Sequence, residues 1–471
     1  MGVFMRVYNT LTRKKEEFIP MIENKADIYV CGPTVYDLMH VGNARPLVIF
    51  DTLRRYLMYK GYNVNFVQNL TDVDDKIIVR ANELGSTFEA VAEIYVKEAL
   101  ADIRGLNCLD ATTMPRVTQE MGEIISMIQT LIDKGFAYEK NGSVYYSTRS
   151  FEHYGCLSGK NIDDLNAGAR VDVNDEKNDP LDFVLWKPNK PGEPKWPSPW
   201  SDGRPGWHIE CSAMTKKYLG DTFDIHAGGM DIIFPHHENE IAQSEAANGK
   251  PFARYWMHVG LININNEKMS KSLGNFFTLR EVAEAFSYEV VRFFILMAHY
   301  RSPVNFSDEL LKAAQSGLER IKNSAGLIKF AADNSSKALI GNEDDIIREA
   351  SAYVSDFEAS MEDDLNTANA IAAIFEFVKY ANKQISKPIS SVGAASLLNV
   401  LLKLTGVLGL EMLKEAPSDA DGNNEVEGLI AKRQEARKAK DFQTADAIRN
   451  TLTEMGVVLE DRPDGVRWSF K

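Results

Sequence analysis

The chain has 471 residues, of which 44% are hydrophobic and 25% are charged, and its formal net charge at pH 7 is −14. This composition is typical of a globular protein with room for roughly three domains. A chain this acidic does not coat nucleic acid nonspecifically, because that mode needs a broad cationic surface, but a local basic patch is not excluded.

The chain carries no sign of export or of a membrane anchor. Its first residues lack the apolar stretch of a signal peptide. The most apolar region, residues 397–413, is short and interrupted by polar side chains, which predicts a buried helix rather than a membrane span. Four scattered cysteines do not make a disulfide framework in a chain of this length, so we expect reduced thiols or a metal site. We therefore expect a cytoplasmic protein without membrane contact.

The N-terminal region has the pattern of a mononucleotide-binding unit. Residues 28–30 form a short β-rich run, and residues 44–60 have helical periodicity that Gly61 ends. A second strand fits residues 64–67, and the polar segment 71–76 follows it, where ligands of open parallel sheets bind. These elements predict the first half of a doubly wound fold.

The pattern changes after residue 120. A helix, a hairpin over residues 137–147 and a segment rich in Pro, Trp and Lys over residues 187–205 predict an insertion between two halves of the sheet. Strand signals resume at residues 223–225, and a helix is expected from Pro235 to about Asn248, with proline at its first position. We expect the sheet to finish there.

The C-terminal third is predicted to be mainly helical. Residues 307–410 have almost continuous helical character, and the acidic segment 415–425 is typical of a flexible linker. Helices over residues 426–440 and 444–455 follow, and then a hairpin that turns at residues 462–465. The expected architecture is an α/β Rossmann-like domain with a doubly wound parallel sheet and an insertion, then an α-helical bundle and a small α+β domain.

Two short motifs far apart in the chain indicate a nucleotide site. The tetrapeptide from His40 to Asn43 lies between a strand end and a helix start, where backbone N–H groups and the helix dipole favour phosphate. The alternative is that it only caps the helix. The pentapeptide from Lys268 to Ser272 has Asn residues before it and Gly and Asn residues after it, which predicts a mobile loop. The ammonium groups of Lys268 and Lys271 could then neutralise a triphosphate. The alternative is a solvated loop with two surface lysines. Together the motifs predict aminoacyl-adenylate chemistry.

A dispersed set of side chains offers ligands for a metal. His236 and Glu240 are four residues apart on the predicted helix and share a face. With Cys31 and Cys211 they make a plausible zinc set, although the alternative is two buried thiols and a polar run that caps a helix. His208, His226, His237 and His258 are further candidates to bind metal or ligand, with a buried, hydrogen-bonded role favoured for His208 and His258. Trp207, close to Cys211, is a candidate wall of the pocket.

These segments resemble the cysteinyl-tRNA synthetases, a family of class I aminoacyl-tRNA synthetases. The resemblance runs essentially from end to end and is carried, in the family's order, by residues 29–37, 206–212, 234–240 and 268–272. It implies an enzyme that activates L-cysteine with ATP to cysteinyl-adenylate and pyrophosphate, and then transfers cysteine to the 3′-terminal adenosine of its tRNA. The resemblance assigns one Zn²⁺ to Cys31, Cys211, His236 and Glu240, and the amino acid to Gly32, Thr71 and Trp207. It assigns ATP with Mg²⁺ to His40, Asn43, Gly228, Gly229, Asp231, Lys268 and Lys271. The catalytic residues among these are expected to be His40, Asn43, Lys268 and Lys271.

The resemblance also implies how cysteine is selected. The family's zinc binds the substrate thiolate, and zinc prefers sulfur over the hydroxyl of serine. An editing domain is then unnecessary, which agrees with the short insertion. One position departs from the usual class I motif, because Asn43 stands where a second histidine is common. An amide still donates to phosphate, so we expect the role to persist.

A charge reversal near the C-terminus points to RNA. Residues 411–430 have a net charge of −5 and residues 431–450 a net charge of +3. The resemblance assigns the last segment to the anticodon, with phosphate contacts expected from the basic helix and base contacts from the hairpin. The alternative is a solvated helix face. The residues expected to contact tRNA are Lys432, Arg433, Arg437, Lys438, Arg467 and Trp468.

Two rival functions remain. One is a ligase that delivers cysteine to an amino sugar, and its family lacks the segment that corresponds to residues 411–471. The other is a non-catalytic zinc protein that binds RNA, in which the phosphate motifs would be free to decay.

The resemblance divides the chain into six parts, and we expect the protein to act as a monomer. The expected parts are 1–119 and 206–260 for the two halves of the catalytic domain, 120–205 for the connective insertion, 261–306 for the stem-contact region with the Lys268 loop, 307–414 for the helical bundle and 415–471 for the anticodon-binding domain.

Overall fold

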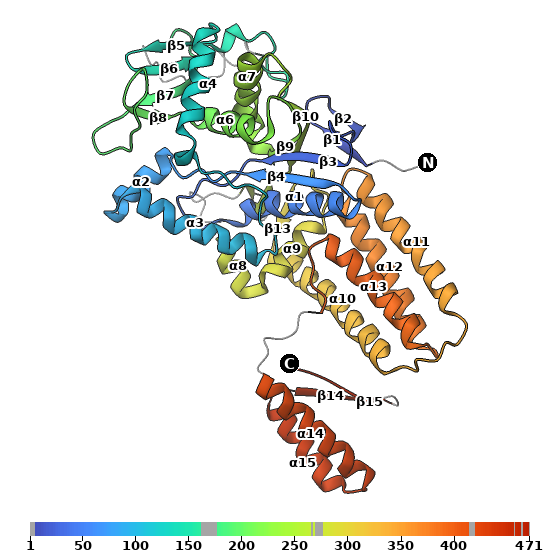
Figure 1. Cartoon of the computed structure of the whole chain (residues 1–471). Coiled ribbons are helices and arrows are strands. Elements are labelled where there is room, and N and C mark those ends of the chain that lie inside the picture. The colour runs from blue at the N-terminus through green and yellow to red at the C-terminus, as the bar shows by residue number, and fades with distance from the viewer. Residues whose placement is uncertain are drawn as a thin grey trace.

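A four-stranded parallel sheet organises the N-terminal half of the protein (Figure 1). The computed structural model describes residues 5–161, 177–264, 267–268, 277–413, 420–455, 457–462 and 465–470. The strand order is β10-β9-β3-β4, and all three pairings are parallel. The strands are β3 (Lys25–Val30), β4 (Asn63–Gln68), β9 (Phe223–Gly229) and β10 (Ala253–Val259). The predicted doubly wound fold is confirmed, but the sheet does not finish before residue 250, since β10 adds a strand at its edge.

Helices cover both faces of this sheet because its strands are apolar on both sides. Ile28 and Val30 of β3 pack into one hydrophobic cluster, and Tyr29 packs into the other, as the two-residue period of a strand requires. Helix α1 (Val41–Tyr59) contacts β4, β9 and β10 on the first face. The other helices of this region are α2 (Asp75–Leu84), α3 (Phe88–Gly105), α6 (Trp207–Leu219) and α7 (Glu238–Asn248).

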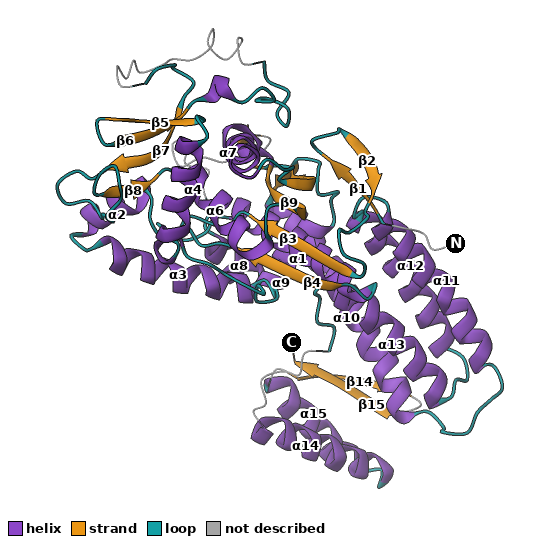
Figure 2. Ribbon diagram, turned by 45° about the horizontal axis from the view of Figure 1, so that its top comes forward, coloured by secondary structure: helices purple, strands orange, loops and turns teal. Residues whose placement is uncertain are grey.

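The insertion forms a second, antiparallel sheet on one side of the first (Figure 2). The predicted hairpin is confirmed by β5 (Ala137–Lys140) and β6 (Ser143–Tyr146), and α4 (Met121–Asp133) precedes it. The order β5-β6-β7-β8 also contains β7 (Phe183–Pro188) and β8 (Gly203–Pro205). These two strands lie at the two ends of the Pro-rich segment, and the sequence pattern did not predict them. Short helical turns η1 (Val117–Gln119) and η2 (Thr148–Ser150) flank the hairpin.

Small elements join the catalytic sheet to the helical bundle. A three-stranded sheet has the order β12-β11-β13, with bounds Glu267–Lys268, Ile262–Ile264 and Val304–Phe306. Helices α8 (Leu279–Phe286) and α9 (Tyr288–Leu296) lie between β12 and β13 in the chain. At the N-terminus, the hairpin of β1 (Arg6–Asn9) and β2 (Lys14–Glu17) contacts β10 through β1.

The predicted helical region is confirmed as a bundle of long helices that lie side by side (Figures 1 and 2). Its members are α10 (Asp308–Asn334), α11 (Glu343–Glu362), α12 (Thr367–Ile385) and α13 (Ser391–Val407). Leu397, Leu401 and Leu404 of α13 are fully buried, as expected for the most apolar stretch of the chain. Within the part of the chain that the structure describes, no helix is long and apolar enough to cross a membrane.

The C-terminal unit has its own small core. Helices α14 (Ala420–Lys438) and α15 (Phe442–Glu454) pack with β14 (Val457–Arg462) and β15 (Gly465–Phe470) around Val426 and Leu452. The predicted strands of the hairpin are confirmed, while Pro463 and Asp464 of its turn lie outside the described residues. The linker prediction is corrected, since residues 420–425 begin α14 rather than a flexible segment.

Candidate metal centre and nucleotide site

The candidate site lies at the carboxyl ends of the parallel strands, where the loops that leave each strand converge. Cys31 directly follows β3, and Asn69 and Thr71 follow β4. Gly228 and Gly229 end β9. The ends of three strands, β3, β4 and β9, therefore bring polar side chains and closely packed backbone to one edge of the sheet.

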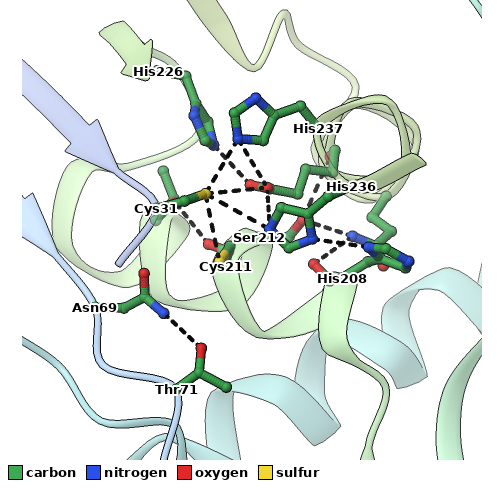
Figure 3. A network of polar contacts seen from close by, with 12 residues as sticks. Cys31, Asn69, Thr71, His208, Cys211, Ser212, His226, His236 and His237 are labelled. Carbon is green, nitrogen blue, oxygen red and sulfur yellow. Dashed lines mark hydrogen bonds and ion pairs between the residues drawn. The ribbon is translucent and has the colours of Figure 1, made fainter. Parts of the chain in front are cut away.

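Four side chains predicted as metal ligands come together at this edge (Figure 3). The sulfur of Cys31 lies 4.0 Å from the sulfur of Cys211, 3.6 Å from Nε2 of His236 and 3.7 Å from Oε1 of Glu240. Nε2 of His236 lies 3.0 Å from the same carboxylate oxygen. One donor atom from each residue falls within 4.8 Å of all the others. Two thiols, an imidazole and a carboxylate within this span fit the donor chemistry of a tetrahedral zinc site.

The four candidate ligands come from four different local structures, and Cys31 belongs to the loop after β3. Cys211 lies in α6, one turn after Trp207. The expected helix from Pro235 is corrected: residues Ile233–His237 form a π-helical turn, η4, after the 3₁₀ turn η3 (Met230–Ile232), and α7 begins only at Glu238. His236 and Glu240 nevertheless share a face across this junction.

The members of this group shift one another's pKa values. The thiol of Cys31 donates to the sulfur of Cys211 and lowers the pKa of Cys211 to about 6, although burial acts in the opposite direction. Burial would raise the pKa of Glu240, but the neighbouring His226 and His236 lower it to about 2. Burial would likewise lower the pKa of His236, yet Glu240 and Cys211 raise it to about 10. These contacts place a thiolate and a carboxylate around a protonated His236, and a bound cation would take the place of that proton.

Further histidines, which the sequence could not rank, support this group. Nε2 of His226 lies 2.7 Å from Oε2 of Glu240. His237 lies 3.3 Å from the Cys31 sulfur through Nε2 and 2.8 Å from Nε2 of His258 through Nδ1, and His258 reaches Thr10. Cys31, His226, His237 and Glu240 therefore form a second group with metal-binding spacing that shares two members with the first.

The side chains around the first group favour it over the second. Nδ1 of His208 lies 2.9 Å from Nδ1 of His236, so the ring nitrogen of His236 away from the cluster is already held by a neighbour. His226 holds the outer oxygen of Glu240 in the same way. Such outer contacts orient metal ligands. In the second group His258 holds His237 in the same way, but the buried Nδ1 of His226 has no hydrogen-bond partner within the described residues. The hydrogen-bonded, buried role expected for His258 is confirmed, and that for His208 agrees with its contact.

The residues expected to bind the amino acid lie beside the metal group. A Cβ atom on Gly32 would fall 1.6 Å from the backbone oxygen of Asn69, so only glycine allows β3 and β4 to approach this closely at their ends. The backbone N–H of Gly32 donates to Oδ1 of Asn69. Nδ2 of Asn69 donates to the hydroxyl of Thr71 (Figure 3). Asn69 thus fixes two predicted pocket residues and was missed from the sequence, because nothing local distinguishes it.

Trp207, the expected wall of the pocket, lies against the candidate metal group. Its ring stacks on the imidazole of His236, with centroids 4.1 Å apart and planes inclined by 20°. It is 39% exposed, whereas His236 is buried, so one face of the indole packs on the metal group while part of the side chain faces solvent. This arrangement suits a residue that contacts a small substrate.

The tetrapeptide from His40 to Asn43 forms the N-terminus of α1. His40 is the N-cap residue, and its backbone N–H donates to Oδ1 of Asn43 at 3.1 Å. The capping role is therefore present, and it orients the Asn43 amide with its oxygen toward the backbone. The backbone N–H groups of Val41 and Asn43 already donate to the oxygens of Phe277 and His40. The amide donors of Asn43 and the backbone N–H of Gly42 are left to offer to phosphate. Capping and anion binding are compatible here.

A second turn beside β9 holds the glycines expected at the ATP site. A Cβ atom on Gly228 would lie 2.7 Å from Ile232, and one on Gly229 would lie 2.4 Å from the carboxylate of Asp231. Asp231 itself is exposed within η3. Lys268 ends β12, and its backbone pairs with Asn263, but its side chain and the whole of Lys271 lie outside what the structure describes.

The residues expected to contact tRNA are only partly placed. Lys432, Arg437 and Lys438 are exposed on α14. Arg433, the other basic residue expected to contact tRNA from this helix, is 4% exposed and lies on the inward face of α14. The backbones of Arg467 and Trp468 lie in β15, opposite Glu460 and Leu459.

Comparison with known proteins connects this site to a reaction. Residues 17–316 match the family described as tRNA synthetases class I (C) catalytic domain. Residues 356–413 match the DALR domain, and residues 419–468 match the cysteinyl-tRNA ligase anticodon binding domain. A cysteine–tRNA ligase of Lachnospira eligens is 58% identical over 99% of this chain and 100% of its own, and one of Clostridioides difficile is 54% identical over 98% and 99%.

The chain belongs to the cysteine–tRNA ligase family. It is an aminoacyl-tRNA ligase of class I, and ATP, an amino acid and tRNA are its substrates. The residues that match the anticodon binding domain form α14, α15, β14 and β15 in the structure.

Solved structures confirm the fold of the ligase. A Mycobacterium tuberculosis methionyl-tRNA synthetase in complex with methionyl-adenylate superposes with a TM-score of 0.60 at 16% identity, over 82% of this chain and 89% of that one. A ternary complex of Agrobacterium radiobacter LeuRS with tRNA and LeuAMS gives 0.60 at 12% identity, over 84% and 85%. At these identities the likeness supports the class I fold alone.

Proposed function

We propose that Cys31, Cys211, His236 and Glu240 hold one Zn²⁺ and that this site selects L-cysteine for activation by ATP. The observation that carries the proposal is the convergence of the four donor atoms within 4.8 Å beside Gly32, Thr71 and Trp207. When bound, zinc supplies a sulfur-preferring Lewis acid that distinguishes a thiol from a hydroxyl. Discrimination of this kind leaves no need for an editing domain.

The amino-acid pocket then orients the substrate for reaction. Gly32 allows close approach between the ends of β3 and β4, and Asn69 fixes the Thr71 hydroxyl at the same edge. Trp207 covers the metal group from the solvent side. A cysteine held by its side chain at this edge directs its carboxylate toward the N-terminus of α1, where nucleotide phosphates are favoured.

The nucleotide residues act in the first half-reaction. A carboxylate oxygen of cysteine attacks the α-phosphorus of Mg²⁺-bound ATP, and the bond to pyrophosphate breaks. The side chains of His40 and Asn43 and the N-terminus of the α1 dipole would stabilise the phosphate oxygens, and Gly228, Gly229 and Asp231 would hold the rest of the nucleotide. Lys268 and Lys271 are proposed for the departing pyrophosphate from their motif alone.

The second half-reaction uses the rest of the chain. A hydroxyl of the 3′-terminal adenosine of tRNA attacks the activated carbonyl, and AMP leaves. The exposed Lys432, Arg437 and Lys438 would contact phosphates, and Arg467 and Trp468 would contact unpaired bases. A monomeric state and a cytoplasmic location stay predictions.

Two activities measured on the zinc-loaded protein test this function. We expect ATP–pyrophosphate exchange that depends on cysteine, followed by charging of cysteine-specific tRNA. Exchange without charging would favour the rival ligase that delivers cysteine to an amino sugar. The absence of exchange in zinc-replete protein would contradict both enzymatic functions and favour an RNA-binding protein without catalysis.

A further inference from the structure

A buried arginine joins the two parts of the nucleotide site. Arg45 lies in α1, five residues after His40, and is 1% exposed. Its Nη1 donates to the backbone oxygen of Leu261 at 2.9 Å, and its Nη2 donates to the backbone oxygens of His299 at 3.2 Å and Ser302 at 2.5 Å. One guanidinium therefore binds two chain segments that are almost 40 residues apart.

Both segments lead directly into the small sheet that ends at Lys268. Leu261 precedes β11, and Ser302 lies two residues before β13. The two strands pair in parallel, and β11 also pairs with β12, whose last residue is Lys268. Arg45 thus holds the start of this sheet against α1, the helix whose N-terminus carries His40 and Asn43.

The chain returns to the same helix end after the Lys268 motif. Thr278 forms a bridge with His40, and the backbone N–H of Leu279 donates to the oxygen of Met39 at 2.8 Å. The segments before and after the motif are therefore both attached to the N-terminal part of α1. Of the two attachments, the first depends on a side chain, that of Arg45.

The chemistry of Arg45 indicates a positional role. A guanidinium is expensive to bury, and burial lowers the pKa of Arg45 to about 10. The acceptors recorded for it are neutral backbone oxygens, which gain less from a charge than a carboxylate would. The planar guanidinium instead fixes positions, because its separate N–H groups donate to carbonyl oxygens of two segments at the same time.

We propose that Arg45 is a positioning residue for amino-acid activation, which sets the separation between the His40 motif and the strand that ends at Lys268. This inference rests on the proposed roles of these motifs at ATP. Arg45 touches no substrate and acts through the backbone segments that it binds. Because the two motifs must reach the same triphosphate, an error of about 1 Å in their separation lowers the rate by up to about a hundredfold.

Arg45→Lys tests the proposal, since lysine keeps the charge and loses the fork. We expect the kcat of cysteine-dependent ATP–pyrophosphate exchange to fall at least about tenfold and the KM for ATP to rise. The KM for cysteine and the zinc content should stay within twofold of the unchanged protein. Circular dichroism and a thermal unfolding scan establish that the variant is folded at the assay temperature.

A second variant changes the loop that Arg45 binds and leaves Arg45 itself unchanged. A Cβ atom on Gly260 would lie 2.7 Å from the backbone oxygen of Ser302 and 2.8 Å from that of Arg301. Gly260→Ala should therefore move this loop relative to Arg45 and cause the same loss of kcat and of ATP affinity without any change of charge. In the double variant the two losses should combine to less than their product, because both act through one contact.

Arg292→Lys is the matched control. Arg292 is another fully buried arginine, and it binds Asp51 and the backbone oxygens of Leu106 and Leu408 at the base of the bundle. Its loss should lower thermal stability and leave the kcat and the KM for ATP within twofold.

The outcomes separate this inference from the proposed function. No exchange by the unchanged protein contradicts the proposed function itself. Exchange by the unchanged protein together with unaltered kcat and KM for ATP in folded Arg45→Lys overturns the inference alone. If Arg45→Lys does not fold, Gly260→Ala is judged by the same criteria. If neither variant folds, the inference is also overturned, because the role of Arg45 would then be purely structural.

Discussion

The indole of Trp207 lies over the imidazole of His236, with ring centroids 4.1 Å apart (Figure 3 labels the histidine). Trp207 begins α6, and the same helix carries Cys211 one turn later. A proposed wall of the substrate pocket and two proposed metal ligands are thus parts of one packed unit, and substitutions within this unit should separate substrate binding from metal binding.

Removal of the indole should weaken cysteine binding while the metal remains. Trp207→Ala is expected to raise the KM for cysteine about tenfold, because an aromatic contact is worth about 0.5–1.5 kcal/mol beyond the area it buries. Trp207→Phe should recover most of the loss. Exchange kinetics at varied cysteine concentration and zinc analysis provide the measurement, and a variant that loses its zinc would show that Trp207 is a structural support of the ligands.

Replacement of one thiol should remove the metal and the selectivity together. Cys211→Ser exchanges a soft ligand for a poor one, so the protein should contain far less than one zinc per chain. The ratio of cysteine-dependent to serine-dependent exchange should fall at least about a hundredfold. Cys108→Ser is the control, since Cys108 lies by Arg292 and outside the metal group. Normal zinc content in Cys211→Ser would favour the second group, which contains His226 and His237 instead.

The basic face of α14 should matter for tRNA and not for activation. Lys432→Glu combined with Lys438→Glu reverses two exposed charges of the C-terminal unit. We expect the KM for tRNA in charging to rise at least about tenfold, with a weaker dependence on salt, because fewer counterions are released on binding. ATP–pyrophosphate exchange should not change. Lys195→Glu in the insertion is the control, and equal effects of the two variants would indicate a general charge effect.

The helical bundle should lose stability in acid through Glu343. The carboxylate accepts hydrogen bonds from the hydroxyl of Ser390 and from the backbone N–H groups of Ile340 and Gly341, and these lower its pKa to about 2. A carboxyl group whose pKa is lower in the folded than in the unfolded chain stabilises the fold above about pH 4.5 and loses this effect as the pH falls toward 2.

Calorimetric scans between pH 2 and pH 7 measure this effect. In Glu343→Gln the unfolding temperature of the bundle should fall less steeply with decreasing pH than in the unchanged protein. Glu319→Gln is a suitable control, because Glu319 lies on an exposed face of α10. Identical pH profiles for all three proteins would contradict the role of Glu343.

Local sequence determined the elements and the motifs. The β3, α1 and β4 unit was predictable because apolar runs, a helical period and Gly61 act within a few residues of one another. The bundle and the two strands of the terminal hairpin were predictable for the same reason. The motifs around Cys31, Trp207, His236 and Lys268 carried the family resemblance, since each is contiguous in the chain.

Tertiary structure decided which side chains meet. Cys31 and Cys211 are 180 residues apart, and only the parallel pairing of β3 with β9 and the packing of α6 bring their sulfurs to 4.0 Å. The spacing of four residues paired His236 with Glu240, but it did not exclude His226 or His237, because all three histidines lie near the same strand ends. The burial of Arg433 and the hydrogen bond from Arg45 to Leu261 likewise depend on long-range packing. For that reason the sequence indicated which chemical groups are present, and the fold determined how they are arranged.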